Sequence, residues 1–254
     1  MKQIFKFLII ISLIFVSESC ISSAIPSVPK EDDFVENESP NSTDIVDDSV
    51  FEGLTYVAFG DSITFGADYT RNYSQMDNPY PKLVAEELSL LSYKNLAISG
   101  AVFCKNDLNL VCMTDVILSY TEETDIISIM LGVNDWSRSL PLGSIEDNTT
   151  STVYGCLNLI ANHLTTTHER AFSFFMTPYK TTLIRNEDYV LLDVVNAIKQ
   201  VAFAYNIPVL DMYNLGNYEL EMYNSNSDGI HPSQEFIIEY TTPQIVQFIK
   251  QNFK

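Results

Sequence analysis

From residue 54 onward, short apolar runs typical of strands alternate with longer stretches that have helical periodicity. The predicted strands cover residues 54–60, 95–99, 125–131, 171–177 and 207–211. The predicted helices cover residues 81–92, 114–122, 151–168, 187–205 and 233–253. Such alternation is typical of a parallel sheet with crossover helices. The sequence therefore predicts an α/β fold, a three-layer α/β/α sandwich with a flavodoxin-like five-stranded parallel sheet.

Composition limits both the number of domains and the class of partner. The chain has 254 residues, 46% of them apolar, which is enough for one sizeable hydrophobic core. Its formal net charge is −19, and no cluster of lysine and arginine interrupts the acidic sequence. The long-range field of such a protein repels nucleic-acid backbones and anionic membrane surfaces. Neither is expected as a partner.

The first 52 residues have the features of a targeting segment followed by a tether. Lys2 and Lys6 precede an apolar run over residues 7–16, a length typical of a signal peptide and too short for a membrane span. We interpret residues 1–24 as a signal peptide, or as a lipoprotein signal that ends before an acylated Cys20. Residues 25–52 are acidic and polar, as in a disordered linker, so the domain is predicted over 53–254. The mature chain is expected to be secreted or held at the cell surface, with membrane contact only through an N-terminal lipid anchor.

Three cysteines remain after Cys20. Cys104 and Cys112 flank a short polar loop, and a disulfide between them is expected in an oxidising compartment. Cys156 lies on an apolar helical face and is interpreted as a buried thiol. The sequence has no metal-binding cysteine or histidine pattern, and no metal or organic cofactor is expected.

The first three predicted strands each end in a polar turn that contains glycine. The turns are Gly60-Asp61-Ser62, Ser99-Gly100 and Gly132-Val133-Asn134-Asp135. Because the carboxyl ends of parallel strands lie on one rim of a sheet, these turns are expected to meet. Two backbone N–H groups and the Asn134 amide near a serine hydroxyl would form an oxyanion hole. Any single turn is better explained as an ordinary loop, and Ser62 by itself as a helix N-cap.

Asp228 and His231 favour a catalytic role for Ser62. An imidazole that is oriented by a carboxylate can remove the proton of a serine hydroxyl and so activate it as a nucleophile. The three-residue spacing allows one loop to carry both groups, just before the final helix returns to the same rim. By contrast, His163 and His168 lie on the polar face of a predicted helix and are interpreted as solvated side chains.

Four sequence blocks together resemble the SGNH (GDSL-type) hydrolase family. They are Phe59-Gly60-Asp61-Ser62-Ile63-Thr64, Asn95-Leu96-Ala97-Ile98-Ser99-Gly100, Leu131-Gly132-Val133-Asn134-Asp135 and Asp228-Gly229-Ile230-His231-Pro232. The resemblance covers residues 54–252. It implies Ser62 as nucleophile, His231 as general base and Asp228 as orienting carboxylate. It also implies an oxyanion hole from the N–H groups of Ser62 and Gly100 and the Asn134 side chain, and no cofactor.

The substrate is less constrained than the chemistry. Two loops, over residues 136–148 and 212–227, are expected to shape the pocket. Candidate substrate contacts are Asp61, Asp135, Trp136 and Tyr223, although the aromatic residues could equally pack their loops onto the sheet. No extended apolar surface helix argues for lipid aggregates, and a secreted acidic protein suits soluble or cell-wall glycans. We therefore expect a small-molecule or glycan ester as substrate, and a carbohydrate deacetylase or short-chain esterase as the activity.

Two alternatives stay open. One is a lysophospholipase, lipase or thioesterase of the same family. The more distant one is a non-catalytic glycan-binding or adhesion module.

Overall fold

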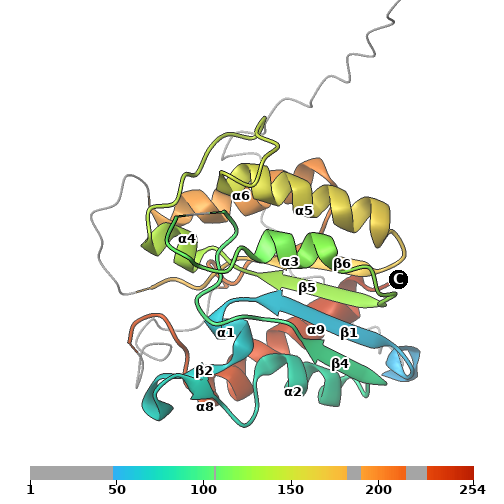
Figure 1. Ribbon diagram of the computed structural model, residues 1–254. Coiled ribbons are helices and arrows are strands. Elements are labelled where there is room, and N and C mark those ends of the chain that lie inside the picture. Colours follow the sequence, from blue (N-terminus) through green and yellow to red (C-terminus); the bar gives the residue numbers. More distant parts are fainter. Residues whose placement is uncertain (1–47, 106, 182–189, 216–227) are drawn as a thin grey trace, which may run out of the picture. The chain divides into compact units, whose positions relative to one another are not determined.

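A five-stranded parallel sheet forms the centre of the computed structural model, which describes residues 48–105, 107–181, 190–215 and 228–254 (Figure 1). In spatial order the strands are β4 Ser92–Asn95, β1 Thr55–Gly60, β5 Ile126–Met130, β6 Phe172–Met176 and β7 Val209–Leu210. All four neighbouring pairs are parallel. Along the chain this order is second, first, third, fourth and fifth, which is the flavodoxin-like arrangement. The predicted fold class is confirmed.

Two of the three inner strands, β1 and β5, are almost entirely buried. Every residue of β5 is buried, and only the first residue of β1 is partly accessible. When helices cover both faces of a sheet, its parallel strands have nearly continuous apolar sequences. Tyr56 pairs with Ile126 and Gly60 with Met130, so β1 and β5 end at the same level. This level is the rim at which the polar turns emerge.

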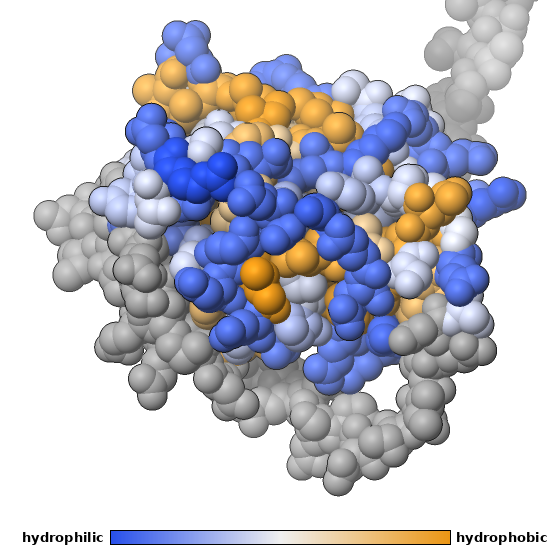
Figure 2. All heavy atoms as spheres, turned by 90° about the horizontal axis from the view of Figure 1, so that it is seen from below, coloured by the Kyte–Doolittle hydropathy of each residue, from blue (hydrophilic) through white to orange (hydrophobic). Residues whose placement is uncertain are grey.

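Helices form a layer on each side of the sheet (Figure 1). One layer contains α2 Tyr80–Glu87, α8 Gln234–Phe236, the π-helical turn η4 Ile237–Thr241 and α9 Thr242–Asn252. The other contains α3 Met113–Ser119, α5 Val153–Thr167 and α6 Leu191–Ala204. Each of the longer helices buries an apolar stripe, such as Val194, Ile198 and Val201 on α6. Figure 2 views the molecule from the side of α2 and α8, where polar side chains separate several hydrophobic patches.

The predicted elements agree in type but differ in several bounds. The second strand lies at Ser92–Asn95 rather than at 95–99, and the helix predicted over 81–92 ends at Glu87. Beyond β4, hydrogen bonds from Leu96 N to Ala58 O (2.9 Å) and from Ile98 N to Gly60 O (3.0 Å) continue the pairing with β1. The predicted final helix is divided by η4, and the predicted helix start at 187 lies outside the described residues.

A small hairpin between β1 and α2 has no counterpart in the sequence prediction. It consists of β2 Ala67–Asp68 and β3 Ser74–Gln75, paired antiparallel, with a short 3-10 helix, η3 Tyr69–Arg71, between them. Strands of two residues give too short a pattern for periodicity to detect. The hairpin follows directly on the turn that contains Ser62.

Residues before the predicted domain start at 53 pack onto the domain. Residues Asp48–Phe51 form a 3-10 helix, η2, and Phe51 is buried in the core against the ring of Phe253. The predicted signal peptide, Cys20 and most of the predicted linker lie outside the described residues. Among the described helices, none has both the length and the hydropathy needed to cross a membrane.

Candidate active site

Ser62 lies at the carboxyl end of β1, as the first residue of the short helix α1 Ser62–Phe65. The preceding Asp61 is the N-cap, and its carboxylate accepts a hydrogen bond from Ile63 N at 2.9 Å. Only glycine fits at position 60, because a Cβ there would lie 2.0 Å from Thr64 Oγ1 and 2.8 Å from Met130 O. The close approach of strand and helix therefore fixes the position of the serine.

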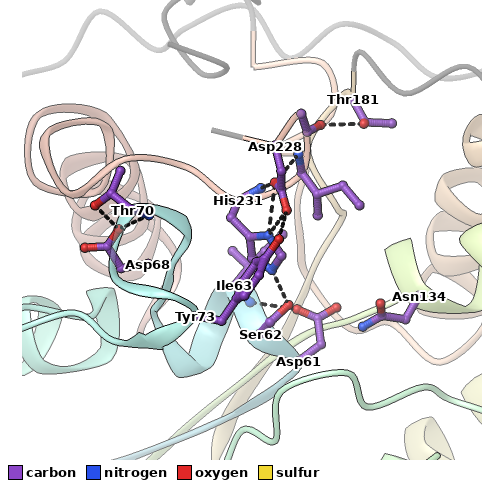
Figure 3. A network of polar contacts seen from close by, with 12 residues as sticks. Asp61, Ser62, Ile63, Asp68, Thr70, Tyr73, Asn134, Thr181, Asp228 and His231 are labelled. Atoms are coloured by element: carbon purple, nitrogen blue, oxygen red, sulfur yellow. Dashed lines mark hydrogen bonds and ion pairs between the residues drawn. The ribbon is translucent and has the colours of Figure 1, made fainter. Parts of the chain in front are cut away.

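His231 and Asp228 reach Ser62 from the loop before α8, 169 residues away for the histidine (Figure 3). The Nε2 atom of His231 lies 2.7 Å from Ser62 Oγ. On the other side of the ring, Nδ1 lies 2.9 Å from Asp228 Oδ2. These partners assign the ring proton to Nδ1, which leaves Nε2 as an acceptor for the serine hydroxyl. The structure thus brings together the three residues that the sequence analysis selected.

Local backbone donors hold the Asp228 carboxylate. Its Oδ1 atom accepts hydrogen bonds from Ile230 N and His231 N, both at 3.0 Å. Burial acts to raise the pKa of Asp228, but the hydrogen bonds from the His231 backbone and ring outweigh it, and the pKa lies below its ordinary value. The carboxylate is therefore ionised at neutral pH, as needed to stabilise an imidazolium.

Gly100 and Asn134 lie on the two neighbouring loops. Gly100 has φ +78°, a left-handed conformation suited to glycine, and a Cβ there would meet only open space. Asn134 belongs to α4 Val133–Ser137, whose N-cap Gly132 has φ +116°. Its Nδ2 atom donates to Ala101 O at 3.0 Å, which directs the amide nitrogen toward the loop that contains Gly100. Within the described residues, the N–H groups of Ser62 and Gly100 have no hydrogen-bond acceptor.

Arg138 orients the Asn134 amide, a role that the sequence analysis missed. Its Nη1 atom donates to Asn134 Oδ1 at 3.2 Å and to Ser137 Oγ at 3.1 Å. A cation on the amide oxygen keeps the amide nitrogen on the opposite side. Arg138 lies four residues after Asn134, and this spacing on a helix could have indicated the contact.

Asp61, Asp135 and Trp136, the candidate substrate contacts, are all buried, and the two carboxylates have hydrogen-bond partners within the protein. Their contact with a substrate stays a prediction. Both carboxylate oxygens of Asp135 accept from Phe103 N at 3.0 Å, which ties α4 to the loop after β4. Asp61 instead caps α1. Tyr223 lies outside the described residues.

Burial also shifts the pKa values of Asp61 and Asp135. It raises the pKa of Asp61 to about 7; the hydrogen bond from Ile63 N acts in the opposite direction, and the nearby Asp135 adds to the increase. Burial raises the pKa of Asp135 to about 6, against the hydrogen bonds from Phe103 N and Cys104 N. Two carboxyl groups with raised pKa values therefore lie beneath the site.

The predicted disulfide between Cys104 and Cys112 is not formed, which corrects the sequence analysis. Backbone hydrogen bonds close this loop instead, from Val102 N to Val111 O (3.0 Å) and from Met113 N to Val102 O (2.8 Å). The Cys112 thiol donates to Phe103 O at 3.1 Å. A hydrogen bond with the buried Cys156, together with burial, raises the pKa of Cys104.

The other two histidines are structural rather than solvated. The Nε2 atoms of His163 and His168 both lie 3.0 Å from the carbonyl oxygen of Tyr120, and His168 is buried. In the described part of the chain, no group of three or more histidine, cysteine, aspartate or glutamate residues is arranged to hold a metal.

The chain matches a known protein family and several solved structures. The sequence profile of the GDSL-like Lipase/Acylhydrolase family matches residues 58–236, more than half of the chain. No curated protein sequence matches this chain. A crystal structure of a protein from Lactobacillus plantarum is similar with a TM-score of 0.69 at 22% identity, covering 80% of this chain and 99% of that one.

Two further solved structures share the fold. A possible lipase from Chitinophaga pinensis has a TM-score of 0.61 at 20% identity, covering 78% of this chain and 98% of its own. A carbohydrate acetylesterase family member from Sinorhizobium meliloti has a TM-score of 0.55 at 15% identity, with 78% and 98% covered. Because the family profile matches more than half of its residues, this chain belongs to the GDSL-like lipase/acylhydrolase family of ester-hydrolysing enzymes.

Proposed function

We propose that this protein is a secreted serine esterase that uses Ser62, His231 and Asp228 as a catalytic triad. The observation that carries the proposal is the continuous chain of contacts from Asp228 Oδ2 to His231 Nδ1 (2.9 Å) and from His231 Nε2 to Ser62 Oγ (2.7 Å). This is the arrangement that serine acyl transfer requires. The charged and apolar segments at the amino terminus support export from the cell.

In the first half of the reaction, Ser62 Oγ attacks the carbonyl carbon of the ester while its proton passes to His231 Nε2. Asp228 stabilises the imidazolium through its bond to Nδ1. The tetrahedral intermediate then expels the alcohol, which takes the proton from Nε2. The acyl group remains on Ser62.

Three donors are positioned to stabilise the negative oxygen of that intermediate. They are the N–H groups of Ser62 and Gly100 and the Nδ2 group of Asn134, whose orientation Arg138 supports. Removing one such donor typically slows an acyl-transfer enzyme about 10²–10³-fold.

The second half of the reaction repeats the same steps with water. His231 removes a proton from a water molecule, which attacks the acyl carbon, and the proton then returns to Ser62 Oγ. The products are a carboxylic acid and an alcohol, and no cofactor takes part.

For the substrate, we propose acetyl or other short acyl esters of carbohydrates. The acidic, exported chain suits soluble or cell-wall glycans, which carry no dense negative charge to be repelled. The similar structure from Sinorhizobium meliloti, a carbohydrate acetylesterase family member, gives the proposal further support.

One observation favours a second candidate, a lipase or lysophospholipase. The loop that contains Gly100 exposes three aliphatic side chains, Ile98, Leu108 and Val111, which could contact an acyl chain. A panel of esters from acetylated sugars to long-chain lysolipids separates the two candidates. Higher kcat/KM for acetyl esters favours the deacetylase, whereas kcat/KM that rises with chain length favours the lipase.

The triad itself is tested by substitution and covalent labelling. We expect Ser62→Ala to lower ester hydrolysis at least ~10³-fold and to abolish labelling by a fluorophosphonate, with the thermal midpoint little changed. His231→Ala should act nearly as strongly. Ser119→Ala and His163→Ala are matched controls, since in the described structure these side chains hydrogen-bond to the backbone carbonyls of Val116 and Tyr120 and not to the triad. Full activity in Ser62→Ala would exclude the triad. A wild type that the fluorophosphonate does not label would favour the alternative of a non-catalytic glycan-binding or adhesion module.

A further inference from the structure

The β2–β3 hairpin places a tyrosine, Tyr73, against the Asp228–His231 pair (Figure 3). The Tyr73 hydroxyl donates a hydrogen bond to Asp228 Oδ2 at 3.0 Å. The Tyr73 ring lies beside the His231 imidazole, with ring centroids 5.3 Å apart and an interplanar angle of 67°. One side chain therefore touches both the carboxylate and the imidazole, although 155 residues separate Tyr73 from Asp228.

The backbone at Tyr73 is held in an unfavourable conformation. Asn72 and Tyr73 have φ values of +54° and +60°, and a left-handed conformation costs a non-glycine residue roughly 1–2 kcal/mol. Asp68 fixes the turn, because its carboxylate accepts from Thr70 N (2.9 Å) and its carbonyl accepts from Tyr73 N (2.8 Å). Strain of this kind persists where the surrounding structure enforces it, often at functional sites.

Tyr73 adds a hydrogen-bond donor to Asp228 from outside the histidine loop. The backbone donors of Ile230 and His231 both bind Oδ1 of Asp228. The Tyr73 hydroxyl binds the other oxygen, Oδ2, which also has the shorter contact with His231 Nδ1. With donors on both oxygens, the carboxylate plane cannot rotate without breaking a hydrogen bond.

The hydroxyl remains a donor through neutral pH. The hydrogen bond to Asp228 raises the pKa of Tyr73 above its ordinary value, so the phenol stays protonated. The Tyr73 residue is 44% exposed, so it lies at the surface and does not belong to the core.

We propose that Tyr73 is a positioning residue, which holds Asp228 and through it the His231 ring in the orientation that serves Ser62. This inference rests on the proposed function of the triad. Tyr73 acts through Asp228 and His231 and takes no part in bond making.

Loss of the hydroxyl has one expected consequence. Asp228 can rotate and His231 is less often aligned, so Tyr73→Phe should lower kcat about tenfold with KM within about twofold, as for loss of a hydrogen bond to a charged group.

A matched control separates the contact with Asp228 from the presence of the hairpin itself. Tyr69→Phe is the matched control, because Tyr69 lies in the same hairpin, packs against the Tyr73 ring and has no hydrogen bond to the pair.

The experiment compares full-length wild type, Tyr73→Phe and Tyr69→Phe in kcat, KM and thermal midpoint. A kcat about tenfold lower in Tyr73→Phe alone, with KM within about twofold and the midpoint unchanged, supports the inference. A kcat of Tyr73→Phe equal to that of Tyr69→Phe overturns the inference and leaves the proposed function standing. If wild type shows no Ser62-dependent hydrolysis, the proposed function fails, and the inference that rests on it fails with it.

Discussion

Asp61 shows how one residue beside the nucleophile can make the stability of the fold depend on pH. The residue is only 1% exposed, and its carboxylate accepts the hydrogen bond from Ile63 N that begins α1. Burial raises its pKa to about 7, whereas an aspartate in an unfolded chain has a pKa of about 4. The folded state therefore binds this proton more tightly than the unfolded state does. Its contribution to stability is fully present below about pH 4 and is lost as the pH rises to about 7.

We expect Asp61→Asn to reduce this pH dependence, because asparagine keeps an oxygen for Ile63 N and never ionises. Each tenfold difference in proton affinity corresponds to about 1.4 kcal/mol, so the variant should lose a few kcal/mol less free energy of unfolding between pH 4 and 7. Denaturant unfolding across this range measures the effect.

The control for that variant is Asp68→Asn. Asp68 makes the same kind of side-chain cap, to Thr70 N at 2.9 Å, but it is only partly buried. A pH dependence of Asp61→Asn identical to that of wild type and Asp68→Asn would contradict the role assigned to Asp61.

At the scale of elements, the sequence predicted the three inner strands of the sheet best. β1, β5 and β6 lie within one residue of their predicted bounds. β4 was predicted too late, because its residues Ser92–Asn95 are mostly exposed at the sheet edge and form no apolar run. The apolar residues at 96–98 drew the prediction toward them, although they only continue the pairing beyond the strand.

The link between α4 and the loop after β4 can be tested through Asp135. Asp135→Ala would leave the N–H groups of Phe103 and Cys104 buried without this acceptor, and each such loss costs about 1–3 kcal/mol. We expect a clear fall in the thermal midpoint. Since the same loop contains Gly100, kcat for ester hydrolysis should fall as well. The kinetics are measured at a temperature well below the new midpoint.

A suitable control is Asp115→Ala. Asp115 forms an ion pair with Lys105 at 3.2 Å, but both side chains are half exposed, and such surface pairs contribute little to stability. Equal midpoints for Asp135→Ala and Asp115→Ala would show that the buried link does not hold the two loops together.

At the scale of the whole molecule, the domain extends to residues that their composition placed in a linker. Phe51 lies in a strongly acidic, polar neighbourhood of the sequence, yet its side chain is 1% exposed and packs at 5.5 Å from the ring of Phe253. The amino-terminal end of the described chain is thereby joined to the segment after α9. Local composition could not reveal this contact, because the partner lies near the opposite end of the sequence.

We expect Phe51→Ala to lower the free energy of unfolding by roughly 3–5 kcal/mol, as for other buried phenylalanines. Val50→Ala is the control, since Val50 is 50% exposed and a surface change of this kind typically alters stability by less than about 0.5 kcal/mol. Denaturant unfolding of both variants measures the difference. Similar values for the two would place Phe51 outside the cooperative unit.

The sequence by itself determined the α/β class, the order of strands and helices, and the four loops that contain Ser62, Gly100, Asn134 and His231. These features depend on local patterns: apolar runs that bury a strand, and glycines where the backbone must turn sharply or adopt positive φ. Only the tertiary structure decided that Asp135 is a buried link and that Tyr73 reaches Asp228. Such contacts depend on how an inserted hairpin and distant loops pack against each other, and no periodicity in the chain encodes that.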